Sequence, residues 1–319
     1  MKNLCRKSLV LLSIVFLSNP LSLVLLWLLN RLFLRPFRSF FVVYPASQRY
    51  ADHYGFKFLQ PALKKTPVIC GVYFQGGTPG LILGISGTES DFKKPGFLSN
   101  LKKKSDQIAR WLGISSVKYS GILPSSMHRA GVLEPLELKR RSSRVAQVVF
   151  RAEKELRQQL SIETETPVIL LGGHGSVGTP LQRLLQAQGR SVYTVDCDDP
   201  IPESLRGERV ILIDVARKGA LEVRMPQLWQ GIIILNETYP APRKRTLQKL
   251  EELTIPVFHI AGVKGIAIPH FPGAYSGAIP CCGMNDSDDN QPLLKYLSSE
   301  ILRKKLAQQN QNNISSIAA

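Results

Sequence analysis

Three glycines in one short stretch carry the clearest chemical information in this sequence. Gly173, Gly175 and Gly178 stand in the spacing G-x-G-x-x-G, directly after the apolar run 167–172. In a dinucleotide site the first glycine allows a tight turn, the second lets the backbone approach a pyrophosphate, and the third lets helix and strand pack closely. We therefore interpret this stretch as a phosphate-binding turn.

The residues that follow the turn support binding of a dinucleotide. Apolar spacing predicts a helix over 177–188, and the N–H groups at its start attract an anion. Asp196 ends the next predicted strand, about 20 residues after the turn, where a carboxylate accepts hydrogen bonds from a ribose diol and repels a 2′-phosphate. The sequence therefore predicts NAD as the cofactor, with NADP disfavoured. The contacts predicted from the turn are Gly173, His174, Gly175, Ser176, Val177 and Gly178.

Other candidate site residues stand where predicted strands end, because ligands of open parallel sheets bind outside the carboxyl ends of the strands. Asp214 and Asn236 close two later apolar runs, and we expect both to line the cofactor; for Asp214 the alternative is a simple cap of its own loop. Lys118 and Tyr119 close an earlier strand. Lys118 is suited to polarising a carbonyl, and Tyr119 to donating a proton to a developing alkoxide.

The run 261–289 is rich in glycine and proline, and the sequence predicts a long loop there. Long loops inside compact domains are usually functional. Lys264, His270 and Cys281 are its candidate catalytic residues. His270 titrates near neutrality and suits acid–base catalysis, whereas Cys281 as a nucleophile would indicate thioester or aldehyde chemistry. For each residue the alternative is packing or turn formation.

The elements that must position these residues alternate between strands and helices, which predicts an α/β fold with a doubly wound parallel sheet. The strands are predicted at 41–44, 68–74, 81–85, 117–121, 167–172, 191–196, 209–215, 231–235 and 256–260, and the other helices at 98–112, 138–160, 243–253 and 293–308. The predicted domains are a membrane anchor (1–39), an N-terminal α/β lobe (40–160), a Rossmann dinucleotide-binding lobe (161–290), a C-terminal helix packing on the first lobe (291–308) and a disordered tail (309–319).

This layout resembles the dehydrogenases whose catalytic lobe precedes their NAD(P) lobe, such as shikimate dehydrogenase and methylenetetrahydrofolate dehydrogenase. The resemblance lies in the order of the lobes, the long helix before the glycine turn and the returning C-terminal helix, and it is specific over about residues 165–240. It implies a substrate bound in the cleft between the lobes, facing the nicotinamide. The catalytic lysine motifs of these families are not found in 41–160, so neither substrate is carried over.

A long uncharged run near the amino terminus predicts attachment to a membrane. No charged residue occurs between Ser8 and Asn30, and ~20 such residues suffice to cross a hydrocarbon core of ~30 Å. Asn19 and Pro20 interrupt the run, so a single span and a hairpin both remain open, as do a buried helix and a signal peptide. Lipid contact is expected through residues 8–38, and a cytosolic cofactor implies that the remainder faces the cytoplasm.

Composition narrows the partners and the compartment. The net charge of +17 favours anionic surfaces, but no nucleic-acid-binding motif is present, so nucleic acid is not an expected partner. The five cysteines are odd in number and lack a disulfide-framework spacing, which is typical of thiols in a reducing compartment. The five histidines show no metal-ligand spacing, so no metal is predicted.

Together these patterns predict a membrane-anchored, NAD-dependent oxidoreductase. The expected reaction moves a hydride between the nicotinamide and a carbonyl, alcohol or imine carbon of a small molecule. Two alternatives remain: a dinucleotide-binding sensor or scaffold without turnover, and an enzyme of another class, such as a methyltransferase, which also carries an acid after its second strand. The sequence does not predict the oligomeric state.

Overall fold

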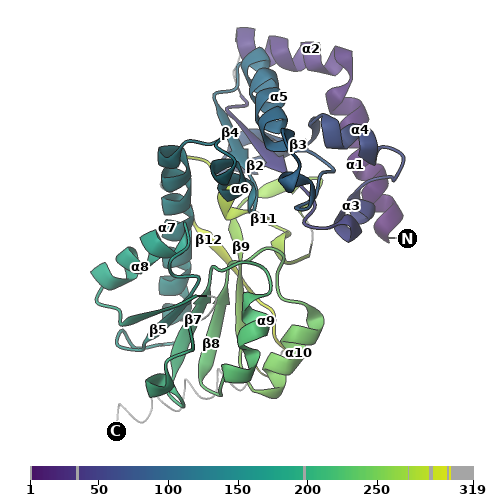
Figure 1. Cartoon of the computed structure of the whole chain (residues 1–319). Coiled ribbons are helices and arrows are strands. Elements are labelled where there is room, and N and C mark those ends of the chain that lie inside the picture. The colour runs from purple at the N-terminus through teal and green to yellow at the C-terminus, as the bar shows by residue number, and fades with distance from the viewer. Residues whose placement is uncertain are drawn as a thin grey trace. The chain divides into compact units, whose positions relative to one another are not determined.

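The computed structural model contains two α/β units, and it describes residues 2–33, 36–196, 199–271, 273–286, 290–299 and 302. Unit 1 consists of Met1–Leu138 and Val263–Asn290, and unit 2 of Lys139–Gly262 and Gln291–Ala319 (Figure 1). The mixed α/β class is therefore confirmed, but the division differs from the expected lobes. The segment 1–39 belongs to unit 1 instead of forming a domain of its own, and 263–290 returns to unit 1 after the chain has entered unit 2.

Unit 1 is built on a five-stranded mixed sheet with the order β10-β2-β3-β1-β4. β1 runs parallel to β3 and β4, whereas β2 is antiparallel to β3 and β10. Gly76 and Gly77 both have positive φ, which lets them form the tight turn between β2 and β3. The strands are β1 (Ser39–Val43), β2 (Val68–Gln75), β3 (Thr78–Gly84), β4 (Ser116–Tyr119) and β10 (Ile266–Ile268). The helices after the amino-terminal pair are α3 (Gln48–Tyr54), α4 (Gln60–Lys65), α5 (Phe97–Leu112) and α6 (Leu123–Arg129).

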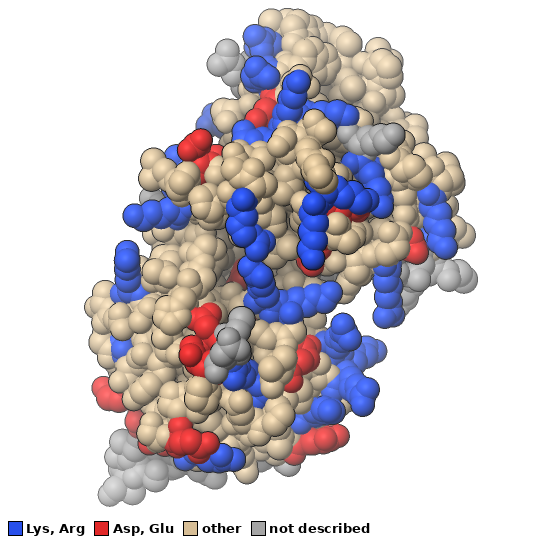
Figure 2. Space-filling model, viewed as in Figure 1, with Lys and Arg blue, Asp and Glu red and all other residues tan. Residues whose placement is uncertain are grey.

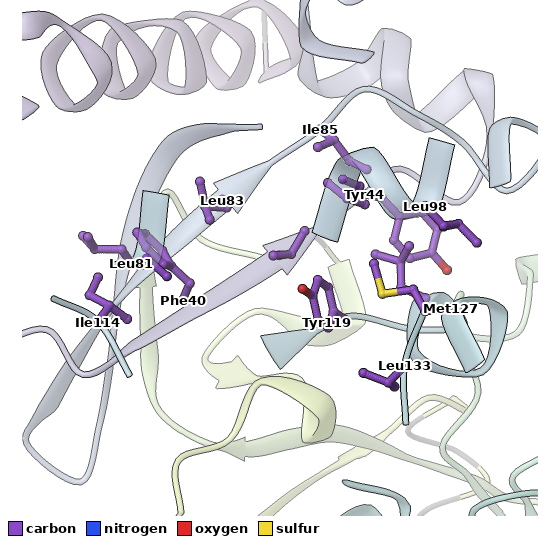
Figure 3. Close-up of a cluster of buried hydrophobic side chains, with 14 of the residues drawn as sticks. Phe40, Tyr44, Leu81, Leu83, Ile85, Leu98, Ile114, Tyr119, Met127 and Leu133 are labelled. Atoms are coloured by element: carbon purple, nitrogen blue, oxygen red, sulfur yellow. The ribbon is translucent and has the colours of Figure 1, made fainter. Parts of the chain in front are cut away.

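The two faces of this sheet differ because side chains alternate along each strand. On one face, Phe40 and its neighbours pack with α5 and α6 in an apolar core that includes Leu81, Leu98 and Met127 (Figure 3). On the other face, the ring of Phe41 contacts Phe271, with 6.0 Å between ring centroids. Residues far apart in the chain therefore complete unit 1.

The expected loop over 261–289 is instead partly regular, so that prediction is wrong over the residues that form strands. β9 (Val257–Lys264) continues beyond the expected strand end, and β10 and β11 (Ala278–Ile279) follow it. Glycine and proline limit these strands to short edge segments, which pair with β2 and with β9. The sequence did not predict these edge strands, because their glycine-rich composition is more typical of a loop.

Unit 2 contains a doubly wound sheet whose parallel strands have the order β6-β5-β7-β8-β9. The chain leaves β5 toward β6 on one side and later returns to β7 on the other, so the topological switch point lies between β5 and β7. The strands are β5 (Val168–Leu171), β6 (Val192–Val195), β7 (Val210–Asp214), β8 (Ile232–Asn236) and β12 (Pro292–Tyr296), which pairs with β9. The helices are α7 (Pro135–Gln159), α8 (Gly178–Ala187), α9 (Ala220–Arg224) and α10 (Lys244–Glu252).

The carboxyl-terminal segment does not form the expected helix where it is described. Residues 292–296 form β12 in the sheet of unit 2, so the helix predicted over 293–308 is wrong there. Pairing with β9 leaves the apolar side chains of Leu293 and Leu294 half-buried, and helical spacing had accounted for the same residues equally well. The disordered tail expected at 309–319 lies outside the described residues.

Two helices begin the chain: α1 (Lys2–Ser18) and α2 (Pro20–Leu28), followed by a π-helical turn over Leu29–Phe33. Within the described residues no single helix is long and apolar enough to cross a bilayer. Lys7–Ser18 and Pro20–Leu32 pass the same length and hydropathy test only as a pair, bent by 62°.

A buried ion cluster fastens α7 to the rest of unit 2. The carboxylate of Glu153 is fully buried and accepts from Arg157, while the Arg190 side chain lies 3.3 Å away. Arg157 also donates to the carbonyl of Thr166 at 2.9 Å, just before β5. We expect Glu153→Ala to lower the free energy of unfolding by about 3–5 kcal/mol, because it leaves the buried guanidinium group of Arg157 and the partly buried one of Arg190 without their carboxylate.

Urea unfolding followed by circular dichroism measures this effect. Glu155→Ala, on the same helix but partly exposed, is the control, and it should change stability by less than about 0.5 kcal/mol. Equal unfolding midpoints for the two variants would show that the cluster does not stabilise the unit.

Candidate functional site

The turn after β5 is so closely packed that side chains are excluded from it. A Cβ on Gly178 would lie 2.1 Å from the carbonyl oxygen of Gly172, and one on Gly173 would lie 2.5 Å from the side chain of Thr194. Gly172 itself has a φ of 87°, and a Cβ there would lie 2.8 Å from the Cα of Ala216. Gly172 was not among the expected residues, since the spacing of the motif does not mark the residue before it.

Backbone N–H groups at the start of α8 are available to an anion. The N–H of Gly175 donates to Gly172 and the N–H of Thr179 donates to Gly175, both at 3.0 Å. Within the described chain, the N–H groups of Ser176, Val177 and Gly178 donate to no backbone acceptor outside the helix. First-turn N–H groups and the helix dipole together attract negative charge, so this turn has the chemistry of a phosphate site.

Asp196 lies directly beside the turn. Its carboxylate oxygen Oδ2 accepts from the backbone N–H of His174 at 3.0 Å and lies 2.6 Å from the imidazole Nδ1 of the same residue. The carboxylate remains partly exposed, as does the imidazole. Asp199 joins this group by accepting from the N–H of Asp196 at 3.1 Å. His174, Asp196 and Asp199 have potential metal-ligand atoms within 4.8 Å of one another. His174 and Asp199 are exposed and Asp196 is half-buried, and such clusters of exposed polar groups are common without a metal ion.

A row of polar side chains crosses three neighbouring strands, at the carboxyl ends of β7 and β8 and inside β9. In the sheet register Asp214 pairs with Asn236, and Asn236 pairs with His259. The row therefore lies on one face, the same face as Leu221 of α9 and Leu250 of α10 in the apolar core of unit 2. All three polar side chains are buried, instead of lining an open rim as expected for Asp214 and Asn236.

Burial shifts the pKa of Asp214 strongly. Desolvation raises the pKa of this carboxyl group from 3.8 to about 7, the N–H of Ala216 at 3.1 Å counteracts it, and the charge of Glu222 on α9 raises it further. A carboxyl group with this pKa exchanges a proton near neutrality, which is a common property of functional sites.

His259 was not expected at the site, because it stands inside an apolar strand without any motif. Its Nδ1 lies 2.9 Å from the amide nitrogen of Asn236, whose Oδ1 accepts from the Thr238 hydroxyl at 2.9 Å. Since the amide can only donate, the neutral imidazole carries its proton on Nε2. Burial lowers the pKa of His259 to about 4, so it stays neutral at physiological pH; a hydrogen bond with the backbone of Asn236 opposes this pKa shift, and the charge of Lys295 reinforces it.

In unit 1, an ammonium group and two hydroxyl groups converge on one oxygen atom, and at most two of them can donate to it at once. The Oδ1 of Asn285 lies 3.0 Å from the ammonium of Lys118, 3.4 Å from the hydroxyl of Ser39 and 3.5 Å from the hydroxyl of Tyr73. Ser39 and Tyr73 also share a hydrogen bond of 2.6 Å. These donors come from β1, β2 and β4, and all three side chains are buried. We call Ser39, Tyr73 and Lys118 the donor cluster.

Gly80 permits this arrangement. A Cβ at Gly80 would lie 2.3 Å from the ring of Tyr73, because the ring crosses β3 to reach Ser39 on β1. Burial raises the pKa of Tyr73 to about 12, despite the hydrogen bond to Ser39, so its hydroxyl keeps its proton near neutrality. The backbone of Asn285 is held by Gln75, whose Oε1 accepts from the Asn285 N–H at 2.6 Å.

The other expected catalytic residues are dispersed. Tyr119 lies in the apolar core on the face opposite Lys118, as the alternation along β4 requires (Figure 3). Lys264 is an exposed residue at the end of β9, and His270 is exposed after β10. Cys281 is buried in a short 3₁₀ turn. The structure therefore brings Lys118 together with Tyr73 and Ser39, not with Tyr119. The only signal for Tyr73 is the alternation along β2, which places its side chain among the buried residues of that strand.

Comparison with known proteins adds little. No family model and no curated protein matches the sequence. Among solved structures, the chain is similar to a glyoxylate reductase from Paecilomyes thermophila, with 12% identity, a TM-score of 0.32, and coverage of 88% of this chain and 95% of that one. So distant a likeness transfers neither fold details nor function. The Rossmann-like assignment of unit 2 therefore rests on its doubly wound parallel sheet and on the glycine turn at the switch point.

The shifted pKa of Asp214 predicts a pH-dependent stability. The folded protein retains a proton that the unfolded chain releases, so the contribution of Asp214 is full below about pH 4 and is lost as pH rises through about 7. Relative to Asp214→Asn, wild type should lose up to about 4 kcal/mol over that window. His259 has the opposite slope, because its contribution is lost as pH falls from 6.5 toward about 4.

Urea unfolding of wild type and Asp214→Asn at a series of pH values isolates the aspartate, since His259 is common to both proteins. Asn retains an acceptor for the N–H of Ala216 and serves as a near-isosteric replacement. Parallel stability profiles for the two proteins would contradict a raised pKa.

Proposed function

We propose that this protein is an NAD-dependent oxidoreductase. The observation that carries the proposal is the close-packed turn of Gly172–Gly178 at the switch point between β5 and β7, with the carboxylate of Asp196 hydrogen-bonded to its backbone. Doubly wound sheets bind their ligands at this position. NAD supplies a hydride acceptor or donor there. A glycine turn beside a carboxylate suits a pyrophosphate followed by a ribose diol.

Each residue of this site has a distinct part in the proposal. The N–H groups of Ser176 and Val177 bind the pyrophosphate, and the missing side chain of Gly175 lets the backbone approach it. Asp196 accepts from the ribose hydroxyls and repels a 2′-phosphate, which favours NAD over NADP. His174 holds this carboxylate beside the turn through its backbone N–H.

The donor cluster of unit 1 is proposed to recognise the substrate carbonyl. Lys118 and one of the two hydroxyl groups can donate to the amide oxygen of Asn285 together, because the other hydroxyl proton forms the Ser39–Tyr73 hydrogen bond. Two donors are therefore arranged to stabilise a carbonyl oxygen as negative charge develops on it. During reduction the hydride is added to the carbonyl carbon, and the oxygen takes a proton from Tyr73 or Lys118. Oxidation of an alcohol reverses both transfers.

The proposal includes a cytoplasmic position for both units. Cytosolic NAD is the pool such an enzyme would use. The described cysteines, Cys5, Cys70, Cys281 and Cys282, are all thiols, which is compatible with a reducing compartment.

Replacing Asp196 should change cofactor preference. We expect Asp196→Asn to weaken NAD binding roughly tenfold or more, because it removes a charged acceptor, and to improve NADP binding relative to NAD. Calorimetric titration with NAD, NADP and S-adenosylmethionine measures these affinities. Glu203→Gln, a nearby exposed charge removal, is the control and should leave all three unchanged.

The wild-type titrations also decide between classes of protein. Tighter binding of NADP than of NAD would contradict the assignment of Asp196. Binding of S-adenosylmethionine alone would indicate a methyltransferase, and binding of none would overturn the whole proposal.

Replacing the donor cluster should affect turnover and not cofactor binding. We expect Lys118→Met and Tyr73→Phe each to lower kcat by about 10²–10⁴-fold, as is typical of lost proton-transfer groups. The assay is oxidation of NADH with a panel of aldehydes and 2-oxo acids. Tyr119→Phe is the matched control on the opposite face of the sheet and should retain activity.

Thermal melting and NAD titration of the same variants separate a catalytic effect from misfolding. A wild type that binds NAD but oxidises NADH with no substrate of the panel would favour the sensor or scaffold alternative. Loss of turnover in Tyr119→Phe but not in Tyr73→Phe would contradict the role of the donor cluster.

A further inference from the structure

The first two helices have an apolar face with no partner in the described structure. Ten of the large apolar side chains that are well exposed lie within residues 4–32: Leu4, Leu9, Leu12, Val15, Phe16, Leu21, Val24, Leu25, Leu29 and Leu32. On α1, Leu9, Leu12 and Phe16 recur at helical spacing, so they form one face. In Figure 2 the surface over α2, at the top of the view, is almost free of charged side chains. A group of many exposed apolar side chains on adjacent helices is typical of an interaction site.

The opposite face of the pair is fastened to unit 1. Leu17, Leu23, Leu26 and Trp27 pack against its apolar core. The hydroxyl of Ser18 donates to the carbonyl of Ile69 on β2 at 2.9 Å. Asn30 is buried and donates to the carbonyl of Leu112 at 2.8 Å, at the end of α5.

The bend between the helices is held by a single side chain. The amide nitrogen of Asn19 donates to the carbonyls of Val15 and Phe16, at 2.7 and 3.0 Å, while its oxygen accepts from the N–H of Ser22 at 2.9 Å. Asn19 thereby satisfies the last turn of α1 and the first turn of α2 together. These hydrogen bonds stabilise the 62° bend, which lets both helices pack against the rest of unit 1.

From these contacts we infer that α1 and α2 bind a lipid bilayer from one side, lying in its interface, and do not cross it. A crossing helix would have to give up the buried contacts of Asn30 and Ser18. The outer face offers aliphatic and phenyl groups without hydrogen-bonding side chains, which suits acyl chains better than the mixed polar surface of a protein partner.

The basic residues around the two helices favour anionic lipid as the partner. Residues 1–51 contain no acidic residue, and bases stand at both ends of the apolar run. Of these, the ammonium of Lys7 lies 5.9 Å from the ring centroid of Phe56, and Arg31 is exposed while donating to the carbonyl of Arg110. Basic groups beside an apolar helix face attract negatively charged headgroups.

Flotation with sealed vesicles tests the lipid surface. The full chain should float with phosphatidylcholine–phosphatidylglycerol vesicles and bind roughly tenfold more weakly to phosphatidylcholine alone or in high salt. The double variant Leu12→Glu, Phe16→Glu should lose flotation while keeping its melting temperature. The matched control, Leu136→Glu with Val223→Glu, alters apolar residues elsewhere that are even more exposed, and it should still float.

Cys5 reports whether the segment crosses the bilayer. The native Cys5 is exposed near the start of α1, and the other cysteines are replaced by alanine to leave it as the single thiol. In inverted membrane vesicles from an expressing bacterium, Cys5 and the two units should face the same side, so a membrane-impermeant maleimide should label it without detergent. A cysteine placed at Glu203 is the positive control for that side.

Two results would overturn the inference. Labelling of Cys5 only after detergent, with the Glu203 control labelled throughout, would show a crossing helix. A dimer in light scattering that the Leu12→Glu, Phe16→Glu variant dissociates, together with no flotation of wild type, would assign the apolar face to a second copy of the chain. Neither result depends on NAD binding, so the test is independent of the proposed oxidoreductase activity.

Discussion

At the end of β5 the chain turns where backbone segments meet too closely for any side chain. The turn contacts β6 through Gly173 and Thr194, the segment after β7 through Gly172 and Ala216, and its own carbonyls through Gly178. These contacts fix where α8 begins, and the last residues of β5, β6 and β7 lie side by side in the sheet register. The carboxylate of Asp196 reaches the turn for the same reason, since β6 ends beside it. The geometry of the proposed phosphate site of unit 2 follows from this packing.

Local patterns predicted much of unit 2. The apolar runs of β5, β7 and β8 and the spacing of the glycines indicate strand, turn and helix without any tertiary information. The buried row of Asp214, Asn236 and His259 was only partly predictable. The first two end apolar runs, but His259 lies within one, and only the register of three strands brings it beside Asn236. Burial of the row likewise depends on α9, which was not predicted, and on α10, which the sequence predicts as a helix but does not orient.

Unit 1 was less predictable because its polar site is assembled from distant segments. Ser39, Tyr73 and Lys118 stand on three strands, and Asn285 arrives only after the chain has formed most of unit 2. A pairing across such separations has no signature in local spacing, and loop-closure entropy gives no preference for it. The choice of Tyr119 as the partner of Lys118 followed adjacency in sequence. In a strand, however, adjacent residues face opposite sides, so Tyr119 lies in the apolar core on the face opposite Lys118.

This alternation also separates two surfaces of unit 1. Its sheet presents Phe40 and Val42 to one side, where α5 and the inner faces of α1 and α2 pack, and Ser39 and Lys118 to the other. A bilayer that contacts the outer faces of α1 and α2 therefore lies on the apolar side of the sheet. The donor cluster remains on the opposite side, away from the hydrocarbon that would strongly disfavour a charged lysine. Attachment to lipid and recognition of a polar substrate are thus compatible within one small unit, because the period of two along β1 and β4 directs them to different faces.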